Sequence, residues 1–157
     1  MEVDEIDISK AITESFMKDL LDAMEVDVAI AGAGPAGMTA AYFLAREKAK
    51  TVIFERQLRI GGGMPGGGMM FNRIVVEQKG KELLDEFGIQ TREYRGGYFT
   101  ADSLEAITTI CSKTIKAGAK IFNLISVEDV MIRENDRVAG LVLNWSATSL
   151  AGLHVDP

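Results

Sequence analysis

The sequence has little of what marks a secreted or membrane protein. Cys111 is the only cysteine among 157 residues, so no disulfide can form within the chain. Residues 1–7 are mostly acidic, and no apolar segment of the kind found in signal peptides follows them. No apolar run reaches the roughly 18 residues that a membrane span needs. We therefore expect a cytoplasmic protein without a membrane anchor, in which Cys111 is a small buried thiol rather than a reactive one.

The chain also lacks an excess of basic residues. It carries 17 Lys and Arg against 23 Asp and Glu, a formal net charge of −6, and the two signs are mixed along the sequence. Because nucleic-acid binding depends on neutralising phosphates with clustered cations, this composition argues against a nucleic-acid partner. With 47% apolar residues, the chain is long enough for a single domain with its own core over 1–157.

The first part of the chain predicts a helical extension followed by a βαβ unit. Ile12, Phe16, Leu20 and Met24 recur every four residues, which is one face of a helix within an extension covering 1–25. Short β-branched runs then alternate with a helical segment that begins at Pro35, where a missing N–H does no harm. The predicted elements are a helix over 9–24, a buried parallel strand over 26–31, a helix over 35–48 and a buried strand over 51–54.

The rest of the chain predicts a mixture of helices and antiparallel strands. The elements are a helix over 72–87 ended by Gly88, two short strands over 90–95 and 98–100, a helix capped by Asp102 and ending before Gly118, a buried strand over 120–124, and a hairpin of 127–133 and 137–144 around the turn 134–136. The fold class is therefore α/β, a Rossmann-like FAD/NAD(P)-binding fold with an antiparallel β insertion. Such sheets normally have further strands, so we expect the domain to lack its C-terminal part.

A glycine motif lies between the first predicted strand and helix. Residues 32–37 read Gly-Ala-Gly-Pro-Ala-Gly, which fits G-x-G-x-x-G in the context that a dinucleotide site requires. Gly32 permits the tight turn, Gly34 lets the backbone approach a pyrophosphate, and Gly37 lets helix and strand pack closely. Glu55 ends the second strand, where a carboxylate accepts hydrogen bonds from the adenosine ribose. We expect this unit to bind the ADP part of an adenylated cofactor.

A second glycine-rich segment begins six residues after Glu55. Residues 61–68 contain six glycines, whose backbone N–H groups could converge on an anion. An ordinary flexible surface loop is the alternative. Met69, Met70 and Phe71 follow, and we interpret them as core packing at the start of a helix.

Several longer motifs resemble the thiamine thiazole synthase family from the N-terminal helix onward. They are Phe54–Arg56, Ile60–Met64, Gly66–Asn72, Ala119–Asn123, Ser126–Val130 and Ala151–Pro157. The resemblance implies a transferase that converts NAD, glycine and a sulfur source into ADP-5-ethyl-4-methylthiazole-2-carboxylate with release of nicotinamide. NAD is then a substrate rather than a redox carrier. The resemblance also implies a homo-oligomer, an octamer in this family.

The resemblance assigns site residues one by one. Ala36, Glu55, Arg56, Gly63 and Val127 would line the nucleotide site together with the motif glycines, and His154 and Val155 would join them. Asp156 matches a family ligand of Fe(II), for which a carboxylate is a suitable donor.

Position 154 separates two branches of the family. Members that give up their own sulfur carry cysteine there, whereas the imidazole of His154 has no sulfur to donate. This identifies the sulfide-dependent, archaeal-type branch, with His154 as the catalytic residue to test. Pro65 departs from the family pattern, which often has a bulky aromatic there.

The family's second iron ligand, a histidine, and its arginine for the glycine carboxylate would lie beyond Pro157. We therefore expect the 157-residue chain alone to be inactive.

Three other interpretations stay open from the residues. The βαβ unit and the second glycine loop also suit an FAD-dependent oxidoreductase. A nucleotide-binding fragment without catalysis is the non-enzyme alternative, and an activity on a ribose bisphosphate is a further possibility.

Overall fold

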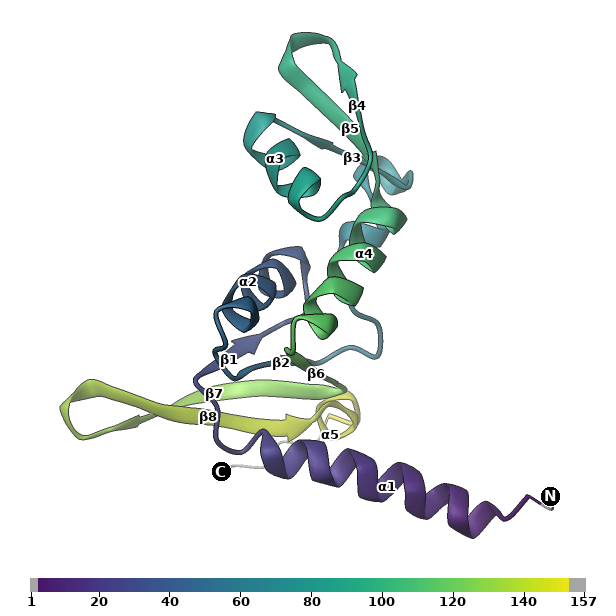
Figure 1. The fold of residues 1–157 in the computed structure, drawn as a ribbon. Helices are drawn as coiled ribbons and strands as arrows, with labels where there is room; N and C mark the ends of the chain where they lie inside the picture. The colour runs from purple at the N-terminus through teal and green to yellow at the C-terminus, as the bar shows by residue number, and fades with distance from the viewer. Residues whose placement is uncertain (1–2, 153–157) are drawn as a thin grey trace.

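The computed structural model describes residues 3–152, so the predicted site residues His154, Val155 and Asp156 lie outside the described part of the chain. Three sheets and five α-helices make up the described fold (Figure 1). Among residues 3–152 there is no helix with both the length and the apolar character needed to cross a membrane.

A three-stranded parallel sheet forms the centre of the nucleotide-binding part. It has the order β1-β2-β6 and consists of β1 (Val28–Ala31), β2 (Thr51–Glu55) and β6 (Lys120–Asn123). The helices α2 (Pro35–Arg46) and α4 (Ser103–Lys116) precede β2 and β6 and lie on one side of this sheet (Figure 1). The βαβ unit predicted from the alternating apolar runs is confirmed, because β1 and β2 pair in parallel with Ala31 opposite Phe54.

The central strand is buried, but its neighbours are less so. All five residues of β2 are buried, as expected for a parallel strand covered on both faces. The prediction of a buried first strand is wrong, because Ala29 and Ala31 are exposed. β1 lies at the edge of the sheet, and within the described residues only β2 pairs with it. β6 forms the other edge and is only partly buried.

Residues of β2 alternate between two apolar clusters, one on each face of the sheet. Ile53 belongs to the cluster under α2 and α4, which includes Met38 and Phe87. Val52 and Phe54 belong to the cluster on the opposite face, with Phe122 stacked on Phe54 at 5.8 Å between ring centroids. β2 therefore contributes apolar side chains to the clusters on both faces of the sheet.

The predicted hairpin covers this second face. It is formed by β7 (Ile125–Arg133) and β8 (Arg137–Trp145), which are slightly longer than predicted and are joined by the turn Glu134–Asp136. A short helix, α5 (Ser146–Leu150), follows β8.

The N-terminal helix α1 (Glu5–Asp22) lies beside the hairpin and points away from the body at its N-terminus (Figure 1). It starts earlier than the predicted 9–24, because the side chain of Asp4 caps it by accepting hydrogen bonds from the N–H groups of Ile6 and Asp7, and it ends at Asp22 with Ala23 as its C-cap. No described residue of α1 is buried. Of the predicted apolar face, Ile12 is exposed, whereas Phe16 lies with its ring 5.8 Å from that of Phe122.

The predicted helix over 72–87 is wrong in its first half. Residues Arg73–Val76 form a strand, β3, and only Gln78–Glu86 is helical, as α3. β3 pairs with β5 (Tyr98–Asp102), which also pairs with β4 (Thr91–Tyr94) in an antiparallel sheet of order β3-β5-β4. The β-branched residues of β3 suit this pairing, which a local helical pattern could not reveal. This sheet and α3 form the antiparallel insertion, at the opposite end of the molecule from α1 (Figure 1).

Candidate nucleotide-binding site

The first glycine loop leads into the N-terminus of α2, where the motif predicts an anion-binding site. Gly32 has φ +97°, and its N–H donates to the carbonyl of Phe54 at 2.8 Å, which fixes the loop to β2. Gly34 caps α2 without a side-chain hydrogen bond, and Pro35 occupies the first turn. The N–H of Met38 makes the bond to the carbonyl of Gly34 that opens the helix, at 3.0 Å. The preceding N–H groups of Ala36 and Gly37 therefore remain available to an anion at the positive end of the helix dipole.

Gly37 allows α2 to pack closely against β1. A Cβ atom at this position would lie 2.3 Å from the carbonyl oxygen of Gly32 and 3.2 Å from Cγ2 of Ile30. Both distances are shorter than ordinary van der Waals contact. The close approach of helix and strand that the third glycine of the motif predicts is present in the structure.

Glu55 ties the end of β2 to the first glycine loop. Its side chain is buried, with Oε2 accepting from the N–H of Ala33 at 2.8 Å and Oε1 accepting from the N–H of Gln57 at 2.8 Å. An ionised carboxylate can accept about four hydrogen bonds, so both oxygens keep the capacity to accept from a ribose hydroxyl. Ala33 was not predicted as a site residue, because it acts only through its backbone.

The second glycine loop lies directly against the first. The N–H of Gly61 donates to the carbonyl of Ala33 at 2.7 Å, and a Cβ on Gly62 would lie 3.5 Å from Cα of Gly34. Within the described chain, the N–H groups of Gly62 and Gly63 have no acceptor. Together with the N-terminus of α2, they place unpaired backbone donors on one small region. This arrangement is what a diphosphate requires.

The three residues after this loop differ from the prediction. Met69, Met70 and Phe71 are exposed at 86%, 88% and 65% of their surface, so their interpretation as core packing at a helix start is wrong. They precede the strand β3, and Met69 and Met70 have positive φ values of 59° and 63°. The chain turns sharply here and leaves these side chains in solvent.

A groove continues from Glu55 between the loop after β2 and the β7-β8 hairpin. It has a volume of about 1220 Å³ and is lined by two predicted site residues, Arg56 and Val127. Leu58 and Leu143 add apolar surface, and Arg56 forms no ion pair with any described residue. The groove was not predicted as a whole, because its two walls come from segments about seventy residues apart in the sequence.

The remaining sequence predictions on reactive groups can be compared with the structure only in part. Cys111 is half-buried in α4, and desolvation raises the pKa of its thiol, which agrees with an unreactive side chain. Among residues 3–152 there is no group of three or more His, Cys, Asp and Glu side chains that could hold a metal ion. The predicted iron ligand Asp156 and its neighbour His154 lie outside this range.

Comparison with known proteins identifies relatives of this chain. The model of the Thi4 family matches residues 9–157. A thiamine thiazole synthase of Methanothermobacter thermautotrophicus is 61% identical over 157 residues, which are 100% of this chain and 60% of that protein. The crystal structure of Thermovibrio ammonificans THI4 superposes with a TM-score of 0.95 at 50% identity, and the match covers 100% of this chain and 62% of that one.

A more distant likeness shows the fold alone. Aklavinone-11 hydroxylase, solved with FAD and aklavinone, superposes with a TM-score of 0.55 at 18% identity, over 76% of this chain and 29% of its own. This agrees with the predicted Rossmann-like fold. The chain spans about three fifths of the length of the thiazole synthases that it matches. Because the family model matches residues 9–157 and the identity to these relatives extends over the whole of this chain, the chain belongs to the Thi4 family.

Proposed function

We propose that this chain is the nucleotide-binding part of a thiamine thiazole synthase, which holds NAD as a substrate during synthesis of the thiazole. Relatives at 50–61% identity over the full chain are thiamine thiazole synthases or THI4, which supports this function. The observation that carries the proposal is the contact between the two glycine loops, through Gly61 and Ala33. It gathers unpaired backbone donors around one anion position, as the diphosphate of NAD needs.

The proposed pose follows from the connectivity of the site. The diphosphate lies at the N-terminus of α2, between the backbones of Gly34 and Gly62. The adenosine ribose then reaches the carboxylate of Glu55, which is fixed by its two backbone donors. The adenine enters the groove beyond Glu55, where Val127 offers apolar and backbone contact and Arg56 supplies a cation that has no ion-pair partner among residues 3–152. The chain's role in this pose is to bind and orient the ADP group while the other end of the substrate reacts.

The chemistry at that other end is also a proposal. The product would be ADP-5-ethyl-4-methylthiazole-2-carboxylate, formed from NAD, glycine and sulfide with release of nicotinamide. Since His154 has no sulfur to donate, free sulfide is the proposed source. Fe(II) with Asp156 as one ligand stays a prediction, as do the homo-oligomer and the cytoplasmic location. The steps proposed for the described residues are those of nucleotide binding, and His154 and Asp156 lie outside these residues.

The decisive experiment is mass spectrometry of small molecules released when the anaerobically purified protein is denatured. From a longer protein that contains this chain we expect an ADP-thiazole carboxylate, or an adduct of ADP-ribose and glycine, whereas the 157-residue chain alone should release only an ADP-containing ligand. Calorimetric titration of the 157-residue chain with NAD and ADP gives a second readout, and binding without turnover is expected for this chain alone. Release of FAD instead would contradict the proposal and favour a flavin-dependent oxidoreductase. Formation of product by the isolated chain would contradict the expected inactivity.

A further inference from the structure

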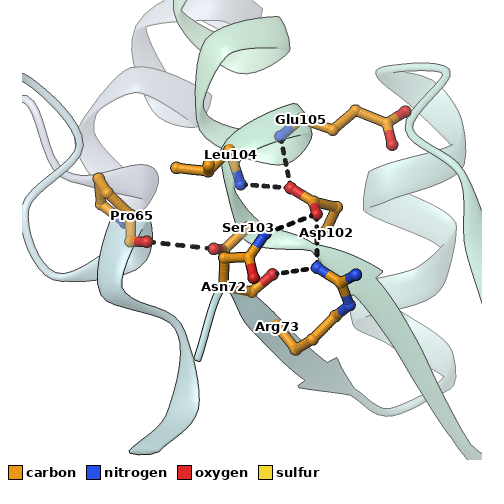
Figure 2. A network of polar contacts seen from close by, with 7 residues as sticks. All are labelled: Pro65, Asn72, Arg73, Asp102, Ser103, Leu104 and Glu105. Atoms are coloured by element: carbon orange, nitrogen blue, oxygen red, sulfur yellow. Dashed lines mark hydrogen bonds and ion pairs between the residues drawn. The ribbon is translucent and has the colours of Figure 1, made fainter. Parts of the chain in front are cut away.

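The start of α4 contacts the second glycine loop at two places, and its N-cap residue contacts the chain just after the loop. Ile107 lies under Gly61, where a Cβ would approach its Cγ1 to 2.5 Å. The buried hydroxyl of Ser103 donates to the carbonyl of Pro65 at 3.3 Å, in the middle of the loop (Figure 2). Asp102 contacts the residues Asn72 and Arg73, which follow the loop (Figure 2). The loop is therefore held between α4 on one side and the first glycine loop on the other.

The two carboxylate oxygens of Asp102 serve different partners. Oδ1 caps α4 by accepting from the N–H groups of Leu104 at 2.8 Å and Glu105 at 3.1 Å. Oδ2 accepts from Nδ2 of Asn72 at 2.9 Å and from Nη1 of Arg73 at 2.5 Å. Figure 2 shows both sets converging on this one side chain. Asp102 thus joins α4 to Asn72 and Arg73, the residues that follow the second glycine loop.

Arg73 and Asn72 reinforce the same junction. Nη1 of Arg73 also donates to the carbonyl of Asn72 at 2.7 Å, and that carbonyl accepts from the N–H of Ser103 at 3.2 Å. The end of the loop is therefore bound to α4 through both side chains and backbone. Such contacts fix where the loop's free N–H groups lie relative to the N-terminus of α2.

We propose that Asp102, with Arg73, is a positioning residue for diphosphate binding, because it holds the second glycine loop against the first. Asp102 itself does not touch the nucleotide in the proposed pose. It acts through Asn72 and Arg73, beside the bond from Ser103 to Pro65, so that the N–H groups of Gly62 and Gly63 face the anion. This inference rests on the proposed nucleotide site and adds to it the residue that sets its geometry.

The two roles of Asp102 can be separated by one substitution. In Asp102→Asn, the remaining carbonyl oxygen can still cap α4, since asparagine is as good a cap as aspartate. The amide nitrogen replaces Oδ2 and presents a donor to Asn72 and Arg73, which are themselves donors. The helix is kept and the junction with the loop is lost. Arg73→Gln removes the ion pair from the other side and leaves Asp102 free to cap.

The test compares ADP with adenosine for each variant of the 157-residue chain. ADP affinity is measured by calorimetry, and adenosine affinity by an NMR titration. We expect Asp102→Asn and Arg73→Gln to weaken ADP binding about fivefold each, the upper range for an exposed charged pair, with less than additive loss in the double variant. Adenosine binding should stay unchanged, because adenosine has no diphosphate. Glu86→Gln is the matched control: it breaks the exposed Arg46–Glu86 ion pair far from the loop and should bind both ligands normally.

Each result decides the inference. A folded Asp102→Asn chain that binds ADP as tightly as the unmodified chain would overturn it, as would an equal loss of ADP and adenosine, which indicates only general destabilisation. If the unmodified chain binds ADP no better than adenosine, the proposed diphosphate site is wrong and the inference fails with it. Circular dichroism melts of each variant separate loss of folding from loss of the junction.

Discussion

Gly34 and Gly37 lie three residues apart in one motif, yet their substitution by alanine should affect different properties. Gly37→Ala should reduce stability, whereas Gly34→Ala should reduce ligand binding. A Cβ on Gly37 would meet the carbonyl oxygen of Gly32 at 2.3 Å, and this carbonyl cannot move freely because the N–H of Gly32 is bonded to Phe54. A Cβ on Gly34 would have nothing within 4 Å, and the backbone of Gly34, with φ −75° and ψ 174°, suits alanine. Gly37 is therefore needed for folding, and Gly34 for access of the ligand.

The magnitudes follow from these contacts. Overpacking at a tight site costs about 1–3 kcal/mol, and contact with backbone puts Gly37→Ala near the upper end. The better helix propensity of alanine returns about 1 kcal/mol. A net loss of about 2 kcal/mol corresponds to a melting temperature lower by about 4–8 °C in a domain of this size. At Gly34, the poorer helix cap and the reduced entropy of the unfolded chain each amount to about 0.5–1 kcal/mol with opposite sign, so the stability should not change.

The assay pairs thermal and urea denaturation with calorimetric ADP binding. Gly37→Ala should unfold at lower temperature and lower urea concentration than the unmodified chain. Gly34→Ala should unfold normally but bind ADP at least about tenfold more weakly, because a methyl group keeps the diphosphate from charge-assisted bonds worth about 1.5–3 kcal/mol. Normal stability of Gly37→Ala, or full ADP affinity of Gly34→Ala, would refute the assignment of these roles.

Three further predictions concern α4 and its cap. The thiol of Cys111 should react with iodoacetamide at pH 8 at least about tenfold more slowly in the folded chain than in urea, because desolvation raises its pKa; equal rates would contradict this. Thr114→Val should lower the free energy of unfolding by about 1–2 kcal/mol in urea titrations, because the single proton of the buried hydroxyl is shared between the carbonyls of Met38 at 3.0 Å and Ile110 at 2.8 Å. The N–H of Glu105, followed by that of Leu104 and the charge of Arg73, lowers the pKa of Asp102. The stabilising contribution of Asp102 should be complete above the ordinary aspartate pKa of about 3.9 and should disappear as the pH falls through the lower pKa of the folded chain. The free energies of unfolding of the unmodified chain and Asp102→Asn, measured against pH, should therefore converge below about pH 4. A constant difference between the two at all pH values would contradict this.

The parts of the fold that the sequence predicted correctly are those encoded by neighbouring residues. The βαβ unit follows from two β-branched runs around a helix that starts at Pro35, and the hairpin follows from alternation around residues 134–136. The helix predicted over 72–87 failed because Ile74, Val75 and Val76 pair with β5, more than twenty residues away. An apolar run likewise could not show that β1 lies at an edge of the sheet, since that depends on which strands flank it.

For the candidate site, motifs and residue spacing predicted which residues take part but not how the two glycine loops contact each other. The glycines of both loops and Glu55 were found from motifs, yet the bond from Gly61 to Ala33 joins residues 28 positions apart. That contact exists because α4 supports the loop through Ile107 and Ser103, neither of which has a motif of its own. The N-terminus of α2 could be recognised from its glycine motif, whereas nothing in the sequence indicated that α4 supports the second glycine loop.

The carboxylate of Glu55 has two roles, one predicted from the sequence and one seen only in the structure. The spacing after the first glycine motif predicted a carboxylate for the adenosine ribose, and the structure uses the same carboxylate to hold the backbone of Ala33 and Gln57. These roles support each other, because a side chain fixed by two backbone donors loses little further freedom when a ribose hydroxyl binds. An acid at the end of β2 therefore suits the geometry of the first glycine loop as well as the proposed nucleotide.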